Sequence, residues 1–444
     1  MTRSFIASVV LVACLSATSL LAADFTVGHL RCEYLKDPLG LDEIHPRLSW
    51  QLHSEERGIR QTAYQIQVAS SPEALANGRA DLWDSGKVSS DNTLFIPYAG
   101  KALVSRQPCH WHVLVWGETG SEPVRSAAST WTMGLLSDDD WSAQYISYRD
   151  TAPIHKDTAE LYLPAARQYR KEFSANKIIT RATIYATALG IYELHLNGQR
   201  VGDAYFAPGW TDYRQRAYYN TYDVTQQVRS GANALGAWVA DGWYSGYVGF
   251  GLLTGMGTEK TGRAVYGKTP AVLVQLEIEY SDGTRQVVGT DSSWKVTGEG
   301  PIQAADLLMG EEYDARREQN GWTQTGFDDA GWGQAILASE NGQPTADFYE
   351  FHNPHNGSGV QIEGEPRQLG FHRPQLQSFP GVPVRVTEEL AAKKIMPRED
   401  GVYLFDLGQN FAGTIRLQLK EPAGQRIQIR YGEMLHPDGR LMTE

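Results

Sequence analysis

Aromatic, amide and carboxylate side chains occur close together between residues 184 and 246. Asn197 belongs to an Asn-Gly pair, and Asp241 opens the run Asp-Gly-Trp-Tyr-Ser-Gly, which contains Trp243 and Tyr244. Aromatic rings stack on the apolar face of a sugar, while an amide and a carboxylate bind its hydroxyl groups. We therefore take Asn197, Asp241, Trp243 and Tyr244 as candidate sugar-binding residues.

The same residues also have a purely structural interpretation. Trp243 and Tyr192 would fill a core, and Asn197-Gly198 would only make the type I′ turn of a hairpin, because both residues tolerate positive φ. The sequence leaves both interpretations open.

Metal binding receives weaker support from the sequence. Asp223 and Asp241 could give hard oxygen ligands to a calcium ion, but the chain has no dense Asp/Asn loop of the calcium-binding kind. The metal ligands are therefore unknown. We expect no required cofactor, with calcium as a possible ligand.

No residues are predicted to be catalytic. The acidic neighbours Glu311-Glu312, Asp328-Asp329 and Asp138–Asp140 lie in expected turns or connectors, where solvated carboxylates are the ordinary interpretation. The histidines lack HExxH spacing, the cysteines lack metal-ligand spacing, and no Walker-type glycine loop occurs. The glycine-rich run 249–257 follows no strand-to-helix switch, so we interpret it as a loop.

Composition excludes several classes of protein. The 444 residues are 41% hydrophobic and 21% charged, which is ordinary for a globular protein of about three domains. The net charge of -12 and the lack of a basic run argue against nucleic acid as a partner. Beyond the N-terminus no apolar run reaches about 18 residues, so we expect no membrane span.

The N-terminus has the pattern of a cleaved secretory signal. Arg3 precedes the apolar run 5–13, and small residues lead to Ala22-Ala23-Asp24, which predicts a periplasmic or secreted protein. The run Leu-Val-Ala-Cys14 offers the alternative of a lipoprotein anchored through Cys14. In an oxidising compartment Cys32 and Cys109 could pair, although two buried thiols are the simpler expectation.

Short strands with period-two alternation continue along the whole mature chain, which predicts an all-β fold. An immunoglobulin-like or fibronectin-type sandwich comes first, with Trp50 and Trp111 in its core. A jelly-roll sandwich of the galactose-binding type follows, and then a third β module that ends abruptly at Glu444, as if cut. The predicted boundaries are 1–23 (signal peptide), 24–136 (first sandwich), 137–166 (linker), 167–337 (jelly-roll), 338–374 (loop-rich linker) and 375–444 (incomplete third module).

Motifs in all three modules together resemble the bacterial α-L-rhamnosidases of glycoside hydrolase family 78. Pro46-Arg-Leu-Ser-Trp50 and Trp83-Asp-Ser-Gly86 are similar to the fibronectin-like start of those enzymes. Ala207-Pro-Gly-Trp-Thr-Asp-Tyr213 and Asp241-Gly-Trp-Tyr244 resemble their N-terminal sugar-binding-like domain. Phe405-Asp-Leu-Gly-Gln-Asn-Phe-Ala-Gly413 is similar to the concanavalin-like β domain that follows.

The resemblance implies an (α/α)6 catalytic barrel after the third module, and this chain lacks it. We therefore expect the N-terminal portion of a secreted α-L-rhamnosidase, which would release terminal α-L-rhamnose by inversion from L-rhamnose-containing glycans. The chain alone is expected to be inactive. The alternative is a stand-alone carbohydrate-binding or adhesion protein; the sequence predicts no oligomeric state.

Overall fold

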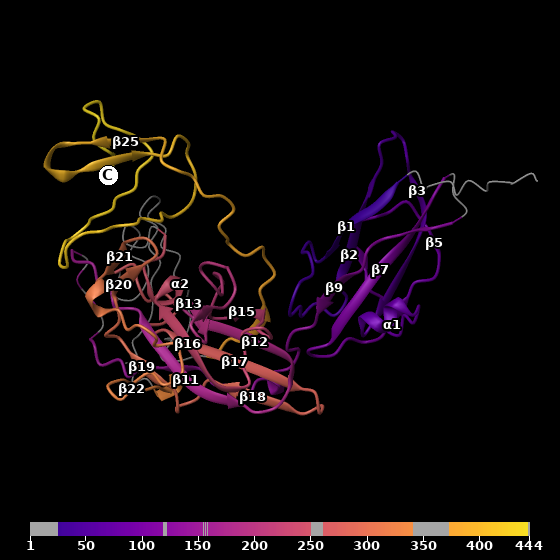
Figure 1. Ribbon diagram of the computed structural model, residues 1–444, viewed down its shortest axis with the longest axis horizontal. Coiled ribbons are helices and arrows are strands. Elements are labelled where there is room, and N and C mark those ends of the chain that lie inside the picture. The colour runs from indigo at the N-terminus through magenta and orange to yellow at the C-terminus, as the bar shows by residue number, and fades with distance from the viewer. Residues whose placement is uncertain are drawn as a thin grey trace, which may run out of the picture. The chain divides into compact units, whose positions relative to one another are not determined.

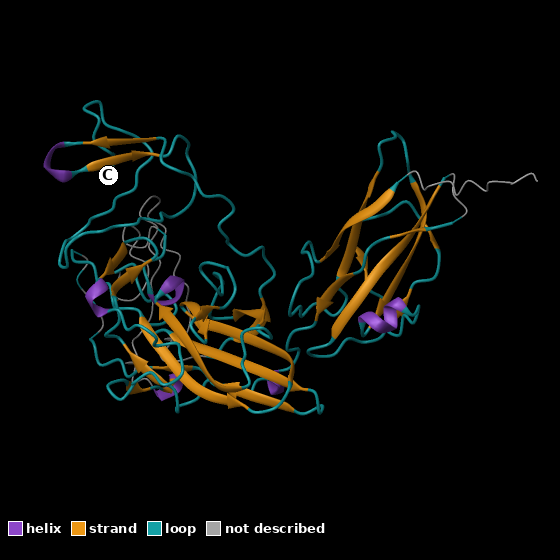
Figure 2. Ribbon diagram, in the orientation of Figure 1, coloured by secondary structure: helices purple, strands orange, loops and turns teal. Residues whose placement is uncertain are grey.

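The computed structural model describes residues 25–118, 122–153, 155, 157, 159–249, 261–340 and 373–442. Strands dominate the described backbone, as Figure 2 shows, which confirms the all-β prediction. Contacts divide the chain into a first unit, Met1–Leu136, and a second unit, Ser137–Glu444 (Figure 1). Within the described ranges, no helix is both long and apolar enough to cross a membrane.

The first unit is a two-sheet sandwich. One sheet has the order β1-β2-β6, and the other has the order β4-β3-β7-β8, with β5 paired to β3 and β9 to β7. The short helix α1 (Pro72–Ala76) is capped by the Ser71 side chain and has proline at its start. The strands are β1 (Thr26–Cys32), β2 (Arg47–His53), β3 (Gln61–Ala69), β4 (Trp83–Asp84), β5 (Val88–Ser89), β6 (Ile96–Pro97), β7 (Pro108–Gly117), β8 (Val124–Arg125) and β9 (Ser129–Thr132).

Tryptophans fill the core of the first unit. Trp50, Trp111 and Trp131 are completely buried, which confirms the core role predicted for the first two. Cys32 and Cys109 lie in the same core as free thiols. Burial raises the pKa of both, that of Cys109 to about 12, so both sulfurs are protonated at neutral pH.

The second unit contains a larger sandwich with one core between its two sheets. One sheet has the order β23-β10-β17-β12-β15-β24 with β18 on β17, and the other has the order β14-β13-β16-β11-β19-β22. The strands of these two sheets are β10 (Ile146–Ser147), β11 (Arg167–Ala175), β12 (Ile179–Leu189), β13 (Ile191–Leu196), β14 (Gln199–Arg200), β15 (Arg216–Asp223), β16 (Gly231–Ala240), β17 (Ala271–Tyr280), β18 (Arg285–Gly289), β19 (Lys295–Thr297), β22 (Gly333–Gln334), β23 (Ile336–Leu337) and β24 (Gln375–Ser378).

Smaller elements complete the second unit. The strands β20 (Ile302–Asp306) and β21 (Gly310–Tyr313) form one hairpin, and β25 (Lys394–Pro397) and β26 (Tyr403–Asp406) form another. The helices are short: α2 (Gly242–Ser245), η1 (Asp138–Asp140), η3 (Ala315–Arg317), η4 (Ala338–Glu340) and η5 (Glu399–Gly401).

The segment 137–166, predicted to be a linker, takes part in the sandwich. Its β10 pairs with β17, and Trp141 packs edge-on against Tyr185 and Tyr219. The side chain of Gln275 on β17 accepts hydrogen bonds from this segment, including one from the backbone N–H of Ser142. The polar run Ser-Asp-Asp-Asp suggested a solvated connector, but the apolar residues after it, Trp141, Ala143, Tyr145 and Ile146, are buried.

The third module forms fewer strands than its sequence pattern predicts. The β25–β26 hairpin is present, whereas 413–419 and 426–431 have no strand assignment and expose their apolar side chains. The backbone of a strand needs a neighbouring strand to take up its N–H and C=O groups. Within the described residues, these two segments have no such neighbour.

Several predictions fall outside the described residues. They are the signal peptide at 1–23 with its alternative anchor Cys14, nearly all of the glycine-rich run 249–257, and most of the loop-rich linker 338–374.

Candidate functional site

Asn197 forms the turn between β13 and β14. Asn197 and Gly198 have φ values of 54° and 82°, as a type I′ turn requires. The Asn197 side chain is buried: it donates to the carbonyl of Gln227 and to Asn233 Oδ1, and it accepts from the N–H of Ala234. Its polar atoms are thus used inside the protein, and Asn197 fixes the hairpin.

Asp241 follows β16, directly before α2, and is buried inside the second unit. Its carboxylate pairs with the guanidinium of Arg263, which is equally buried. Burial raises the pKa of Asp241 to about 6, although Arg263 acts in the opposite direction. Arg263 also lies over the rings of Tyr162 and Tyr247, 5.0 and 5.2 Å from their centroids. The pair therefore joins the Asp241 turn to the segment that follows residue 260.

Tyr244 lies on α2 and is also buried. Its ring packs edge-on against that of Tyr213, with the centroids 5.4 Å apart. Burial raises the pKa of the Tyr244 phenol, so the hydroxyl remains protonated. A side chain at Gly267 would collide with this hydroxyl, which explains why a glycine faces the ring.

Trp243 is the candidate residue that lies near the surface. Its ring stacks on that of Trp210, with the centroids 6.1 Å apart and the planes 8° apart, and Phe206 meets it edge-on at 6.2 Å. Trp210 is 52% exposed and Phe206 is 45% exposed. Phe206 has a φ of 57°, which is uncommon for an aromatic residue. We call Phe206, Trp210 and Trp243 the aromatic group.

The sequence indicated this surface only in part. Trp210 lies in the motif Pro208-Gly-Trp-Thr-Asp-Tyr213, which was recognised as aromatic, yet the residue itself was not selected. Its contact with Trp243 joins residues more than 30 positions apart. Sequence spacing carries no signal for such a contact.

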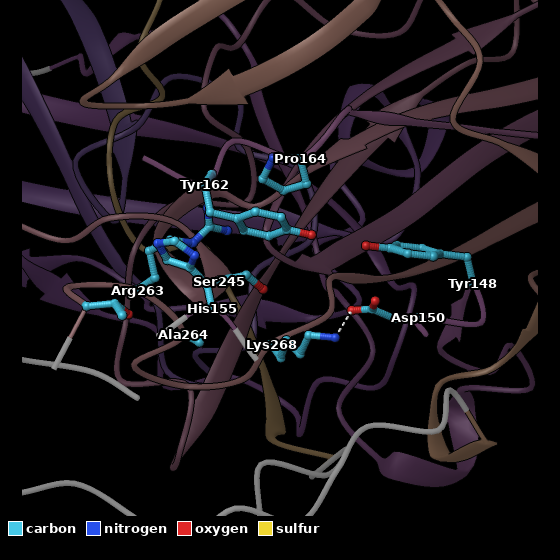
Figure 3. Close-up of a pocket in the computed structure, with 10 residues that line it drawn as sticks. Tyr148, Asp150, His155, Tyr162, Pro164, Ser245, Arg263, Ala264 and Lys268 are labelled. Carbon is cyan, nitrogen blue, oxygen red and sulfur yellow. Dashed lines mark hydrogen bonds and ion pairs between the residues drawn. The ribbon is translucent and has the colours of Figure 1, made fainter. Parts of the chain in front are cut away.

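A polar cavity lies next to α2 (Figure 3). Its volume of about 30 Å³ suits a water molecule and not a sugar ring. Asp150 and Lys268 face each other in it at 2.8 Å, and the hydroxyl of Ser245 is buried there without a hydrogen-bond partner in the described structure. The Asp241–Ser245 turn therefore borders a small, partly enclosed cavity that contains the Asp150–Lys268 ion pair.

The acidic pairs weighed in the sequence do not form a catalytic pocket. Glu311 and Glu312 lie exposed on β21, and Asp138–Asp140 form the 3-10 helix η1. Asp329 pairs with the buried guanidinium of Arg170. Inverting glycosidases place two carboxyl groups about 6.5–9.5 Å apart around their substrate. In the described part of the chain, these acidic residues lie instead on a strand, in a short helix or in an ion pair.

The residues considered for calcium have other partners. Asp223 accepts hydrogen bonds from the N–H and hydroxyl of Thr225, and Asp241 pairs with Arg263. Among the described residues, no group of three or more His, Cys, Asp or Glu side chains is placed to hold a metal ion.

Three successive segments match models of known domains. Residues 27–137 match the Rha78A-like N-terminal immunoglobulin domain, and 177–356 match the alpha-L-rhamnosidase N-terminal domain. Residues 397–444 match the bacterial alpha-L-rhamnosidase concanavalin-like domain. The order of the three matches is that of the modules predicted from the sequence.

Curated relatives and solved structures agree with these matches. An alpha-L-rhamnosidase of Streptomyces avermitilis is 32% identical, over 93% of this chain and 51% of its own length. An alpha-L-rhamnosidase of Formosa agariphila is 34% identical over 93% of this chain and 40% of its own length. The crystal structure of the Streptomyces avermitilis enzyme complexed with L-rhamnose has a TM-score of 0.79 at 31% identity, covering 94% of this chain and 52% of that one. The structure of the alpha-L-rhamnosidase from Dictyoglumus thermophilum has a TM-score of 0.75 at 33% identity, and the match covers 94% of this chain and 42% of that one.

The fold and its sites define a multi-domain all-β chain whose candidate carboxylates serve mainly as structural groups. This chain spans about half the length, or less, of the curated relatives it matches. By its three domains and its relatives it belongs to the bacterial α-L-rhamnosidase family, of which it contains the N-terminal β domains.

Proposed function

We propose that this chain is the N-terminal, non-catalytic part of a secreted or periplasmic α-L-rhamnosidase that releases terminal α-L-rhamnose by inversion. The observation that carries the proposal is the unbroken order of three rhamnosidase domains over a chain half as long as its first relative. In this proposal the signal peptide at 1–23 directs export, and the catalytic acids lie in an (α/α)6 barrel beyond this chain. Its substrates are L-rhamnose-containing glycans.

The exposed apolar residues of the third module support this assignment. Alternate residues of both unpaired segments are exposed and apolar: Ile415, Leu417, Leu419, Ile427, Ile429 and Tyr431. Such rows belong on the buried face of a β-sheet. We place the strands that cover them in the polypeptide that follows in the longer relatives.

The experiment that tests this function is an assay of α-L-rhamnoside hydrolysis by the purified chain, because the proposal requires that the chain alone has no turnover.

A second candidate function, sugar binding by the second unit, is favoured by the aromatic group. The half-exposed ring of Trp210, stacked on Trp243, suits the apolar face and methyl group of a 6-deoxy sugar. In this assignment Trp243 contacts the sugar, while Asn197, Asp241 and Tyr244 hold the turns that position it.

Replacing Trp210 by Ala is expected to weaken L-rhamnose binding by up to about tenfold, because one stacking partner is lost. The measurement is isothermal titration of the chain with L-rhamnose, with galactose as the control sugar and with calcium present or absent. Trp116→Ala, in the first unit, is the matched control and should leave binding unchanged. Equal affinities of the Trp210→Ala variant and the unchanged protein would contradict the sugar-binding assignment.

A further inference from the structure

An open groove lies on the second unit, away from the aromatic group. Its volume is about 370 Å³, within the range of about 300–1,000 Å³ that is usual for ligand pockets. It lies along β11 and β19 and is bordered by the segment 326–329. The side chains that line it and enter the argument are Arg170, Lys171, Glu172, Lys295, Phe327 and Asp329.

Arg170 forms the rigid base of the groove. Its side chain is only 2% exposed, and it donates to the backbone carbonyls of Trp322 and Gln324. The same guanidinium pairs with Glu172, at 2.5 Å, and with Asp329. A buried, fully bonded arginine holds both carboxylates in fixed positions before any ligand arrives.

Each of these carboxylates keeps one oxygen available. Arg170 bonds to Oε1 of Glu172 and to Oδ2 of Asp329. Within the described residues, Oε2 of Glu172 and Oδ1 of Asp329 accept no hydrogen bond. Carboxylate oxygens are strong acceptors for hydroxyl groups, and the ring of Phe327 adds an apolar surface beside them. Fixed acceptors next to an aromatic ring suit a polyhydroxylated ring such as a sugar.

Lys295 gives the groove an available positive charge. It lies directly across from Arg170 in the β11–β19 pairing, so both side chains are on the same face of the sheet. Lys171 is held by Ser293 and lies 4.0 Å from Asp291. Lys295, in contrast, has no ion pair or hydrogen bond with any described side chain. Basic side chains thus outnumber acidic ones in this groove, although the whole chain has a net charge of -12.

We propose that this groove binds a sugar unit that carries one anionic group, a carboxylate or a sulfate. Lys295 binds the anionic group, the spare oxygens of Glu172 and Asp329 accept the hydroxyl hydrogens, and Phe327 contacts the ring. This binding goes beyond the proposed function, because it depends neither on hydrolysis nor on the aromatic group. A failure of anionic-sugar binding in the groove can therefore be told apart from a failure of the proposed function.

The test is titration of the full chain with methyl β-D-glucuronide, with a 6-sulfated methyl β-D-glucoside and with neutral methyl β-D-glucoside. An anionic sugar should bind saturably and about tenfold more tightly than the neutral one, because a charge-assisted contact is added. The preference should shrink as salt is raised. The relative affinities of the carboxylated and sulfated sugars show which anionic group the groove accepts.

Lys295→Gln is the decisive variant, and Lys177→Gln is its control. Lys177 lies in the same unit but pairs with Asp282, outside the groove. Lys295→Gln should lose about tenfold in affinity for the anionic sugar and keep the same affinity for the neutral one. Lys177→Gln should behave as the unchanged chain. The proposal is overturned if neither anionic sugar binds, if neutral and anionic sugars bind alike, or if Lys295→Gln leaves the preference intact.

Discussion

Replacing Arg263 by Met is expected to destabilise the second unit by about 3–5 kcal/mol at pH 8. The substitution removes the partner of Asp241 and leaves a carboxylate inside the protein without a compensating charge. The contacts of the guanidinium with the rings of Tyr162 and Tyr247 are lost as well. The measurement is the free energy of unfolding from denaturant titration, followed by the near-ultraviolet signal of the aromatic residues.

Two further variants separate the buried pair from other effects. The double variant Arg263→Met, Asp241→Asn should recover part of the loss, because no charge is then left unpaired. Arg385→Met removes a surface pair with Asp203, in which both side chains are half-exposed or more, and should cost less than about 1 kcal/mol. A cost for Arg263→Met as small as that of Arg385→Met would show that the buried pair does not stabilise the unit.

The pH dependence of stability provides a second check on this pair. The pKa of Asp241 is about 6 in the folded protein and 3.8 as an ordinary aspartate. Between these values the folded state holds a proton that the unfolded state has lost, so stability falls as pH rises through this window. Asp241→Asn removes the dependence. Without Arg263 the pKa of Asp241 rises further, so the cost of Arg263→Met should be larger at pH 8 than at pH 5.

The 444-residue chain is expected to bind a hydrophobic dye such as ANS strongly and to self-associate as its concentration rises. The cause is the pair of exposed apolar rows, 415–419 and 427–431, which no described strand covers. A shortened variant that ends at Thr387 keeps β24 paired with β15 but lacks both rows. It should bind far less dye and stay monodisperse. Dye fluorescence and light scattering measure the two properties.

A matched substitution keeps the chain length constant. Replacing Leu417 and Ile429 by Thr leaves the strand propensity of both rows high and removes two of the exposed apolar groups. Dye binding should fall between that of the full chain and that of the shortened variant. If the shortened variant binds as much dye as the full chain, the exposed surface lies elsewhere and the third module is not incomplete.

Local sequence patterns predicted those parts of the fold that depend on neighbouring residues. Asn197-Gly198 marked its turn because few residues tolerate positive φ. Ala271–Tyr280 was predicted as a strand from the period-two alternation of its C-terminal half, and it forms β17. The segment 137–166, assigned to a linker from its sequence, contributes β10 to the sheet of the second unit. Its role depends on packing against β17, more than 120 positions away along the chain. The strands predicted at 413–419 and 426–431 failed for the same reason, because strand formation needs a partner.

The candidate site shows the same limit for single side chains. Asn197, Asp241 and Tyr244 have the chemistry of sugar ligands, but the structure shows their polar or aromatic groups in contact with other parts of the protein. Residue type cannot tell an exposed carboxylate from one that pairs with Arg263. Trp210 and Lys295 gain their importance from neighbours that only the folded chain supplies.

The most direct test of the proposed function is the hydrolysis of an aryl α-L-rhamnoside by the purified chain. The full-length Streptomyces avermitilis α-L-rhamnosidase serves as the positive control under the same conditions. The account predicts no release of the aryl group above the blank, because it places the catalytic acids outside this chain. Turnover that increases with the concentration of the purified chain and follows it through a second purification step would contradict the account.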